Sequence, residues 1–483
     1  MAVESILRWP PFAIEHPLLA TQLGQATNKP VYTTEIDLSD LDRAAISQLV
    51  ENFLATHHIK NPICDVEQLW KLVKGVDETG LQWDGSTCLM LLICSVSVLS
   101  AIDKDKDRGY SKRPDRLARA ERYFQASQRR IGMVYHEHSL LAVQCSFLSA
   151  VYLMTTFRIL AAWKAFAQAG TQFMAWLAVR GRIEPHHFGI GPGLVSENHT
   201  PAGSPMQHVE ESLYWSCLKS ELELRTELGY PGSPLNEMHY PHLYPSPPGP
   251  VSMTASFVRP NSDVERDRNL LEKGWFFYLG EIALRRILNE ALSARYGADS
   301  WYYTTEWWTT TSQGNLRAYV EEFKLRLDTW YDTVPEPMHF PQSPGKPAGD
   351  QLRGILRAHL IDVLDVVYFP AVRAVVFEEI SELGPYVLAT ARHALENAAK
   401  RLVISREGYW HRHQGTWLMI RTCSRSSLQL LAVAARARRE PCLEELLPAG
   451  WKHLVAEVVE MIAYWEDESP DLGILLERLK MLM

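Results

Sequence analysis

The sequence lacks closely spaced cysteines. Its seven cysteines are scattered over 483 residues, at positions 64, 88, 94, 145, 217, 423 and 442. Small zinc modules hold the ion with short-spaced cysteine pairs, so this spacing excludes a site of that type. An odd number of cysteines without a repeated spacing also argues against a disulfide framework, and we predict reduced thiols in an intracellular protein.

Sequence motifs of the common enzyme classes are missing as well. The chain contains no phosphate-binding loop, nucleophile elbow or zinc-protease helix. The glycines at 189, 191 and 193 lack the third-glycine spacing and the preceding strand of a dinucleotide site, so we interpret them as a loop. We therefore predict no catalytic residues and no cofactor, and the ligand-binding residues stay unknown.

Histidines occur in close pairs that lack cysteine or carboxylate neighbours at the spacing of a closed zinc site. The triplet His136-Glu137-His138 comes nearest to a ligand set, and we still predict that it binds no metal. No metal ligand is assigned in this sequence. The pairs are His57/His58, His136/His138, His186/His187, His239/His242 and His411/His413.

The chain has no excess of positive charge. Its formal net charge is -8 and its pI is near 6.1, which argues against a surface that holds nucleic acid by itself. We assign no DNA-binding residues. Arginines do cluster within residues 108–119 and 436–439. These arginines could form a local basic patch, but a solvated helix face or loop is the favoured interpretation.

Long uncharged runs are few, and two of them approach the length of a membrane span, at 85–102 and 139–157. Both runs contain Ser, Thr or Cys. The first is followed by alternating acidic and basic residues rather than the basic flank of an inserted helix. We interpret both as buried helices of a large helical domain and predict no membrane association. The first residues show no signal-peptide pattern.

Helical hydrophobic spacing covers most of the chain, and alternating strand patterns are almost absent. We predict an all-α protein, a large multi-helix domain of two packed helical halves. Residues 1–45 are predicted as an extended lead, 46–230 as the N-terminal helical half, 231–262 as a Pro/Tyr-rich connection and 263–483 as the C-terminal helical half. Residues 46–483 together are expected to form one domain. The connection is predicted to dock over a surface rather than act as a flexible linker.

The expected helices follow from apolar periodicity and from prolines and glycines at their ends. Pro370 is predicted to kink or split one of them. Ser469 is predicted to cap the last helix, with Pro470 at its first position. The predicted ranges are 46–58, 66–76, 86–102, 114–134, two helices within 139–180, 264–292, 315–334, 351–380, 384–405, 411–439 and 448–465.

The stretch from Glu210 to Pro248 joins a charged helix to a proline- and tyrosine-rich strap. Gly229 and Pro231 are predicted to end the helix. One apolar face carries Val209, Leu213, Cys217, Leu224 and Leu228, and another carries Trp215, Leu218 and Leu222. A helix with two apolar faces is expected to lie between layers.

The charges of this helix fall at a spacing that allows pairing along its surface. Lys219 and Glu223 are four residues apart, as are Glu221 and Arg225, so we predict two salt bridges within the helix. An acid-rich stretch also suits acid/base chemistry. Charge pairing on a half-buried helix is the favoured interpretation.

The Glu210–Pro248 stretch resembles a signature of the regulatory "middle homology" domain in fungal transcription factors that bind DNA through a two-zinc, six-cysteine cluster. Further blocks are similar to this family in their order along nearly the whole chain. The resemblance implies a helical domain associated with regulation, inhibition and sometimes small-molecule sensing. The blocks are Ile6–Phe12, Leu49–Ile63, Ala120–Ser127, Ser139–Cys145, Ala161–Phe166, Trp275–Asn289, Leu327–Phe340 and His411–Trp417.

The chain departs from the family's pattern in the DNA-binding part. The six-cysteine cluster, the basic segment after it and the dimerisation helix have no counterpart in this sequence. Direct sequence-specific DNA binding therefore does not carry over. Either a truncated gene model, or a cofactor or competitor that pairs with complete regulators, would account for the difference.

We expect a nuclear, transcription-regulator-like protein of a fungus that controls metabolic or secondary-metabolite genes. Its expected partners are the transcription machinery or a full-length regulator, together with a possible small-molecule effector. The alternative is an enzyme evolved on the same helical scaffold within a biosynthetic gene cluster, because fold does not fix function. A scaffold that neither senses nor catalyses is a third possibility.

Overall fold

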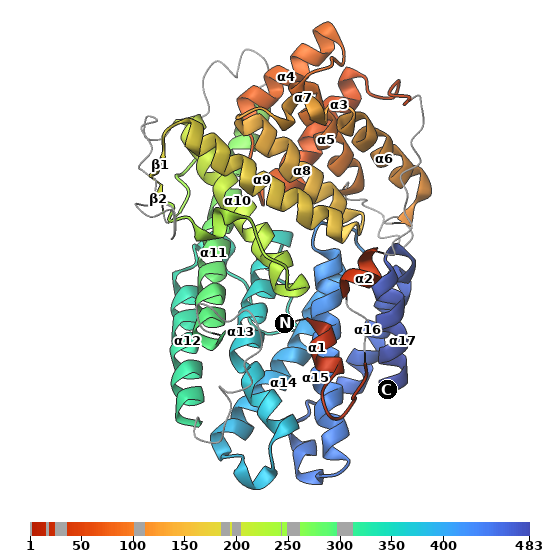
Figure 1. Cartoon of the computed structure of the whole chain (residues 1–483), viewed down its shortest axis with the longest axis vertical. Coiled ribbons are helices and arrows are strands. Elements are labelled where there is room, and N and C mark those ends of the chain that lie inside the picture. The colour runs from red at the N-terminus through yellow and green to blue at the C-terminus, as the bar shows by residue number, and fades with distance from the viewer. Residues whose placement is uncertain are drawn as a thin grey trace.

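The structure is a computed structural model, and the predicted all-α, multi-helix fold is confirmed. Figure 1 shows an upper and a lower group of helices, with α10 (Pro205–Leu228) between them. In the part of the chain that is described, the β structure is one antiparallel pair, β1 (Ile183–Glu184) with β2 (Leu194–Val195). The described residues are 2–15, 19–24, 36–100, 112–184, 194–195, 204–242, 244–248, 261–296 and 313–483.

The upper group is built around two apolar helices, α5 and α8, which pack against each other. Nearly all their side chains are buried, because other helices cover them. The two uncharged runs are thus buried helices, and no helix among the described residues is long and apolar enough to cross a membrane. The bounds are α3 (Arg43–Phe53), α4 (Val66–Thr79), α5 (Gly85–Ser100), α6 (Pro114–Gln128), α7 (Ile131–Tyr135), α8 (Leu140–Thr155) and α9 (Ile159–Val179), with a π-helical turn η1 (Leu54–His58) after α3.

In the described part of the chain, the lower group consists of α11 to α17, seen as the green to blue part of Figure 1. They are α11 (Asn261–Tyr296), α12 (Gln313–Thr333), α13 (Gln351–Phe377), α14 (Pro385–Ser405), α15 (Thr416–Ala437), α16 (Trp451–Trp465) and α17 (Pro470–Leu482). Short 3₁₀ turns join several elements: η3 (Pro234–Glu237), η7 (Glu336–Met338), η8 (Ile380–Glu382), η9 (Arg406–Gly408), η10 (Pro441–Leu446) and η11 (Glu466–Glu468).

The predicted helices differ from the structure in three details. The predicted split at Pro370 does not occur, because α13 continues through this residue and packs against α11, α14 and α15 despite the missing N–H. Ser469 lies at the N-cap position of α17 with Pro470 directly after it, as predicted, but its hydroxyl donates to the Asp471 carboxylate and accepts no backbone N–H of the helix. The stretch predicted as one helix over 114–134 is divided into α6 and α7.

The lead over residues 1–45 was predicted to be extended, and this is also corrected. Its described part contains two short helices, α1 (Val3–Leu7) and α2 (Leu19–Gly24). Helix α1 packs on α15, and α2 packs on α17 and α9. Five residues form too few hydrogen bonds for a stable isolated helix, so the conformation of α1 depends on this packing. Residues 16–18 and 25–35 of the lead lie outside the described residues.

Helix α10 ends as the sequence predicts. Gly229 adopts the left-handed conformation, with φ of 71°, that favours glycine after a helix. The strap then folds back over α10, where the rings of Tyr240 and Tyr214 stack with centroids 4.0 Å apart. The Nε1 atoms of Trp163 and Trp275 donate to carbonyls of the strap, those of Pro231 and Pro245. The docking of the strap is therefore borne out as far as Pro248, and 249–260 lie outside the described residues.

Candidate functional site

The charged side chains of α10 are the main polar feature of the interior. Glu210, Glu211 and Glu221 are fully buried, and Lys219 and Glu227 are nearly so. A buried charge is costly unless a partner compensates it, so each of these groups requires a contact. The partners come from elements on all sides of the helix.

The two salt bridges predicted within α10 are wrong. Lys219 pairs with Glu281 of α11, at 2.8 Å, rather than with Glu223. Glu221 accepts hydrogen bonds from the backbone N–H and the hydroxyl of Ser233 rather than pairing with Arg225. The helix is buried between two groups of helices, so partners on other elements compete with those on its own surface.

Lys219 lies at the centre of the first polar cluster. Its ammonium also donates to the carbonyl of Lys60, at 3.1 Å, and lies 4.8 Å from the ring centroid of Tyr278. Arg285 of α11 pairs with Glu223. We call Lys219, Glu223, Glu281, Arg285 and His359 the Lys219 cluster.

Burial and pairing shift the pKa values of this cluster in different directions. Burial raises the pKa of Glu281, but Lys219, His359 and Arg285 outweigh it, so its pKa is lowered. Burial, followed by the charge of Arg285, lowers the pKa of His359 to about 4. At neutral pH the histidine is uncharged. The two carboxylates are then balanced by the ammonium and the guanidinium.

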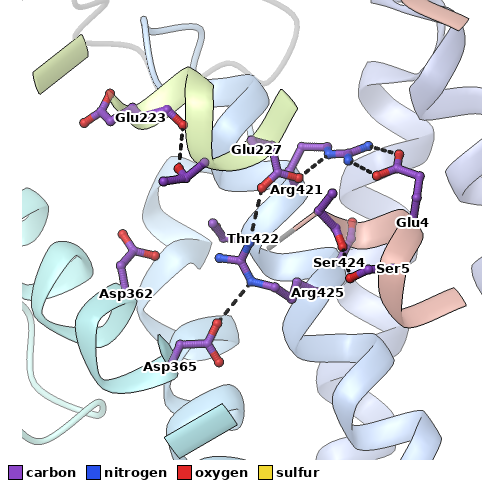
Figure 2. A network of polar contacts seen from close by, with 12 residues as sticks. Glu4, Ser5, Glu223, Glu227, Asp362, Asp365, Arg421, Thr422, Ser424 and Arg425 are labelled. Atoms are coloured by element: carbon purple, nitrogen blue, oxygen red, sulfur yellow. Dashed lines mark hydrogen bonds and ion pairs between the residues drawn. The ribbon is translucent and has the colours of Figure 1, made fainter. Parts of the chain in front are cut away.

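The second polar cluster, shown in Figure 2, joins four helices at Arg421 of α15. Both terminal nitrogens of its guanidinium donate to Glu4 of α1, at 2.8 and 2.6 Å, and its Nε donates to Glu227 of α10 at 2.8 Å. Asp471 of α17 lies 3.6 Å from Nη1. Three carboxylates from distant parts of the sequence thus surround one buried cation.

Arg425, one turn along α15, extends this cluster to α13 (Figure 2). It contacts Glu227 at 3.2 Å and Asp365 at 3.1 Å. Burial raises the pKa of Asp471, although Arg421 and hydrogen bonds from Ser469 and the Trp417 indole act in the opposite direction. We call Glu4, Glu227, Asp365, Arg421, Arg425 and Asp471 the Arg421 cluster.

The first turns of α10 hold the strap through two further carboxylates. Glu210 pairs with Arg182 and accepts from the Tyr240 hydroxyl at 2.8 Å. Glu211 accepts from the backbone N–H of Ser246 at 2.5 Å. The charges of α10 therefore fix the upper group, the strap and the lower group to a single helix.

Glu223, Glu281 and His359 are the described residues whose ligand atoms come close enough to hold a metal ion, within 4.8 Å of one another. The Nδ1 atom of His359 has no hydrogen-bond partner and lies 3.6 Å from Glu281. However, Lys219 and Arg285 already neutralise the two carboxylates. A divalent ion would add uncompensated positive charge to a buried neutral group. The geometry therefore fits a charge network better than a metal centre.

The histidine pairs singled out in the sequence have other contacts. His57 shares a hydrogen bond with the Ser100 hydroxyl at 2.6 Å, and the His58 ring contacts the backbone of Cys64. His136 and His138 are exposed. None of the paired histidines within the described residues belongs to a potential metal group. The pair at 186/187 and the glycine-rich loop at 189–193 lie outside the described residues.

The arginine clusters are partly engaged within the protein. Arg119 contacts Asp40 at 2.9 Å, and Arg436 donates to the carbonyls of Val376 and Glu378. Arg438 and Arg439 are exposed. These contacts agree with a helix face that is partly solvated and partly paired.

The described residues form a small hollow between η1 and α11, with room for about one water molecule. Typical small-molecule sites measure several hundred Å³, so this hollow is too small for a metabolite. Apolar side chains dominate its wall, together with His58 and Asp267. The lining residues are Leu54, His58, Ile59, Pro62, Val66, Asp267, Leu270, Leu271 and Gly274.

No family model matches the chain, and a comparison with curated proteins finds no match either.

The sequence did not indicate the partners of the buried charges. These partners lie in helices with many apolar residues, and the local pattern does not indicate that they are paired. They are Arg421, Arg425, Glu281 and His359. Two arginines four residues apart, Arg421 and Arg425, within a helix whose other residues are mainly apolar or small are the signal that could have identified the second cluster.

Proposed function

We propose that this chain is a transcription-regulator-like protein that acts through its helical body rather than through a DNA-binding cluster of its own. The proposed setting is the nucleus of a fungus, with control of metabolic or secondary-metabolite genes. The observation that carries this proposal is the ordered set of sequence blocks that resembles the middle homology domain. An all-α body of two helical groups is compatible with it.

The interior favours a binding or regulatory protein over an enzyme. In the described part of the chain, the acidic and basic side chains of the Lys219 and Arg421 clusters are largely paired with one another. A catalytic acid or base must reach a substrate proton, and these groups are committed to structural contacts instead. The proposed partners are therefore proteins, such as the transcription machinery or a complete regulator, or a small effector.

A tethering experiment tests the proposal. The full chain is fused to an unrelated DNA-binding domain, and a reporter gene with matching upstream sites is measured in fungal cells. We expect reporter transcription to change relative to the DNA-binding domain alone. Unchanged reporter transcription, with the fusion folded and present in the nucleus, would contradict a regulatory role.

Removing the unrelated DNA-binding domain provides the matched control. The chain alone should then leave the reporter unchanged, because we propose no sequence-specific DNA contact by its own residues. A reporter response to the chain alone would contradict that part of the proposal.

A further inference from the structure

Residues 2–15, here called the docking segment, lie on the lower group of helices like a bound peptide. Helix α1 packs on α15, far from it in sequence, as Figure 1 shows in red against blue. Val3, Ile6 and Leu7 are fully buried, and Trp9 is 6% exposed, whereas Arg8 is exposed. This spacing of anchors is that of a short amphipathic helix in a groove.

Packing determines the shape of the docking segment. A five-residue helix forms too few hydrogen bonds to persist alone, so its contact with α15 imposes the helical turn. The groove is the surface of α15 that contacts α1 together with the surface of α13 that contacts Trp9. The groove side is made of long helices that contact several neighbours. The receptor surface is thus preformed, and the segment is the part that becomes ordered by binding.

One end of the groove recognises a carboxylate. Both terminal nitrogens of Arg421 donate to Glu4, while Nε donates to Glu227 (Figure 2). The guanidinium also lies 5.3 Å from the centroid of the Trp417 ring. Contacts outside the docking segment therefore fix the orientation of the guanidinium. Such a fork binds a carboxylate through two parallel hydrogen bonds.

The other end of the groove accepts an aromatic ring. The Trp9 ring lies 5.4 Å from that of Phe369 and 5.8 Å from that of Phe377, both on α13. Phe377 is 41% exposed, so this end reaches the protein surface. Aromatic anchors in such pockets supply much of the affinity of peptide recognition.

We propose that the groove between α13 and α15 is a peptide-binding site that the docking segment occupies in cis and that an acidic peptide of a partner protein occupies in trans. The partner peptide repeats the pattern of Val3, Glu4, Ile6, Leu7 and Trp9: an apolar residue, a carboxylate, two apolar residues on the next turn and an aromatic ring. The carboxylate complements Arg421, and the ring complements Phe369 and Phe377. This site does not depend on a role in transcription.

In the full chain, the docking segment competes with any added peptide for the groove. A tethered segment has an effective concentration in the millimolar range, so a free peptide must compete against it. Trp9→Ala in the full chain weakens the tethered segment without changing the groove. The probe is a fluorescently labelled peptide of residues 2–15, measured by fluorescence polarisation. We expect the Trp9→Ala chain to bind it at least tenfold more tightly than the unsubstituted chain does.

Peptide variants control for the chemistry of recognition. A probe with Glu4→Gln is expected to bind at least fivefold more weakly, and one with Trp9→Ala more weakly still. Equal binding of all three probes would overturn the proposal. Failure of the folded Trp9→Ala chain to bind the original probe would overturn it too. If the Trp9→Ala chain dimerises and binds no probe, the groove binds a second copy of the chain. That result would overturn the proposed partner peptide.

A second measurement does not rely on a substituted anchor. A protease site is inserted after Glu15 in the full chain, which is cut after folding. We expect the cut segment to co-elute with the body and to be displaced by an excess of the original peptide but not by the Glu4→Gln peptide. A cut segment that no peptide displaces would overturn the proposal.

Discussion

Replacing Arg421 with leucine removes the guanidinium that Glu4, Glu227 and Asp471 share. The Arg421 side chain is 1% exposed, and its three hydrogen bonds to carboxylates have no solvent to replace them. Breaking a buried pair by removing one partner costs about 3–5 kcal/mol, because the remaining charges stay buried. We expect Arg421→Leu to lower the free energy of unfolding by about that amount.

Urea unfolding at pH 7, followed by circular dichroism, measures this loss. Arg326→Leu is the matched control, since Arg326 pairs with Glu290 and Glu322 but its side chain is 41% exposed. Exposed pairs contribute about 0–1 kcal/mol, so this control should unfold nearly like the original chain. If the two substitutions lower the free energy of unfolding equally, Arg421 does not compensate buried charge as proposed.

Two further predictions concern packing and pH. A Cβ on Gly274 would lie 2.7 Å from the backbone oxygen of Ile59, so Gly274→Ala should lower the free energy of unfolding by about 1–3 kcal/mol. Gly75 has open space around it, so Gly75→Ala should not lower this free energy. Equal melting temperatures of the two variants would contradict this prediction. Burial, followed by the charge of Lys60, lowers the pKa of His57 to about 3. Between about pH 6.5 and pH 3, the unfolded chain binds a proton at His57 and the folded chain does not. The contribution of His57 to the free energy of unfolding should therefore fall by about 1.4 kcal/mol for each pH unit below 6.5 in this range. Urea midpoints that do not differ between pH 7 and pH 5 would contradict this prediction.

The helical fold was predictable because apolar periodicity is a local property of the sequence. The runs that form α5 and α8 were predicted as buried helices, and Gly229 marked the end of α10. The lead was harder. The short helix α1 has no intrinsic stability and exists because α15 packs against it, which no local pattern records.

The spacing of charged residues in the sequence could not predict the partners in the charge clusters, for a related reason. The i, i+4 rule applies to a helix surface in water, where Lys219 and Glu223 would be each other's nearest partners. In the protein both groups face other helices, and Glu281 and Arg285 offer partners that are already desolvated. Such pairings depend on the tertiary arrangement of α10 and α11, which brings residues about sixty positions apart into contact.

We propose that the chain regulates gene expression through its helical body. The most direct measurement compares transcript levels between a strain of the source organism that lacks the gene and the same strain with the gene restored. We expect a set of metabolic transcripts to change on deletion and to return on restoration. Transcript levels that stay the same in both strains would contradict it.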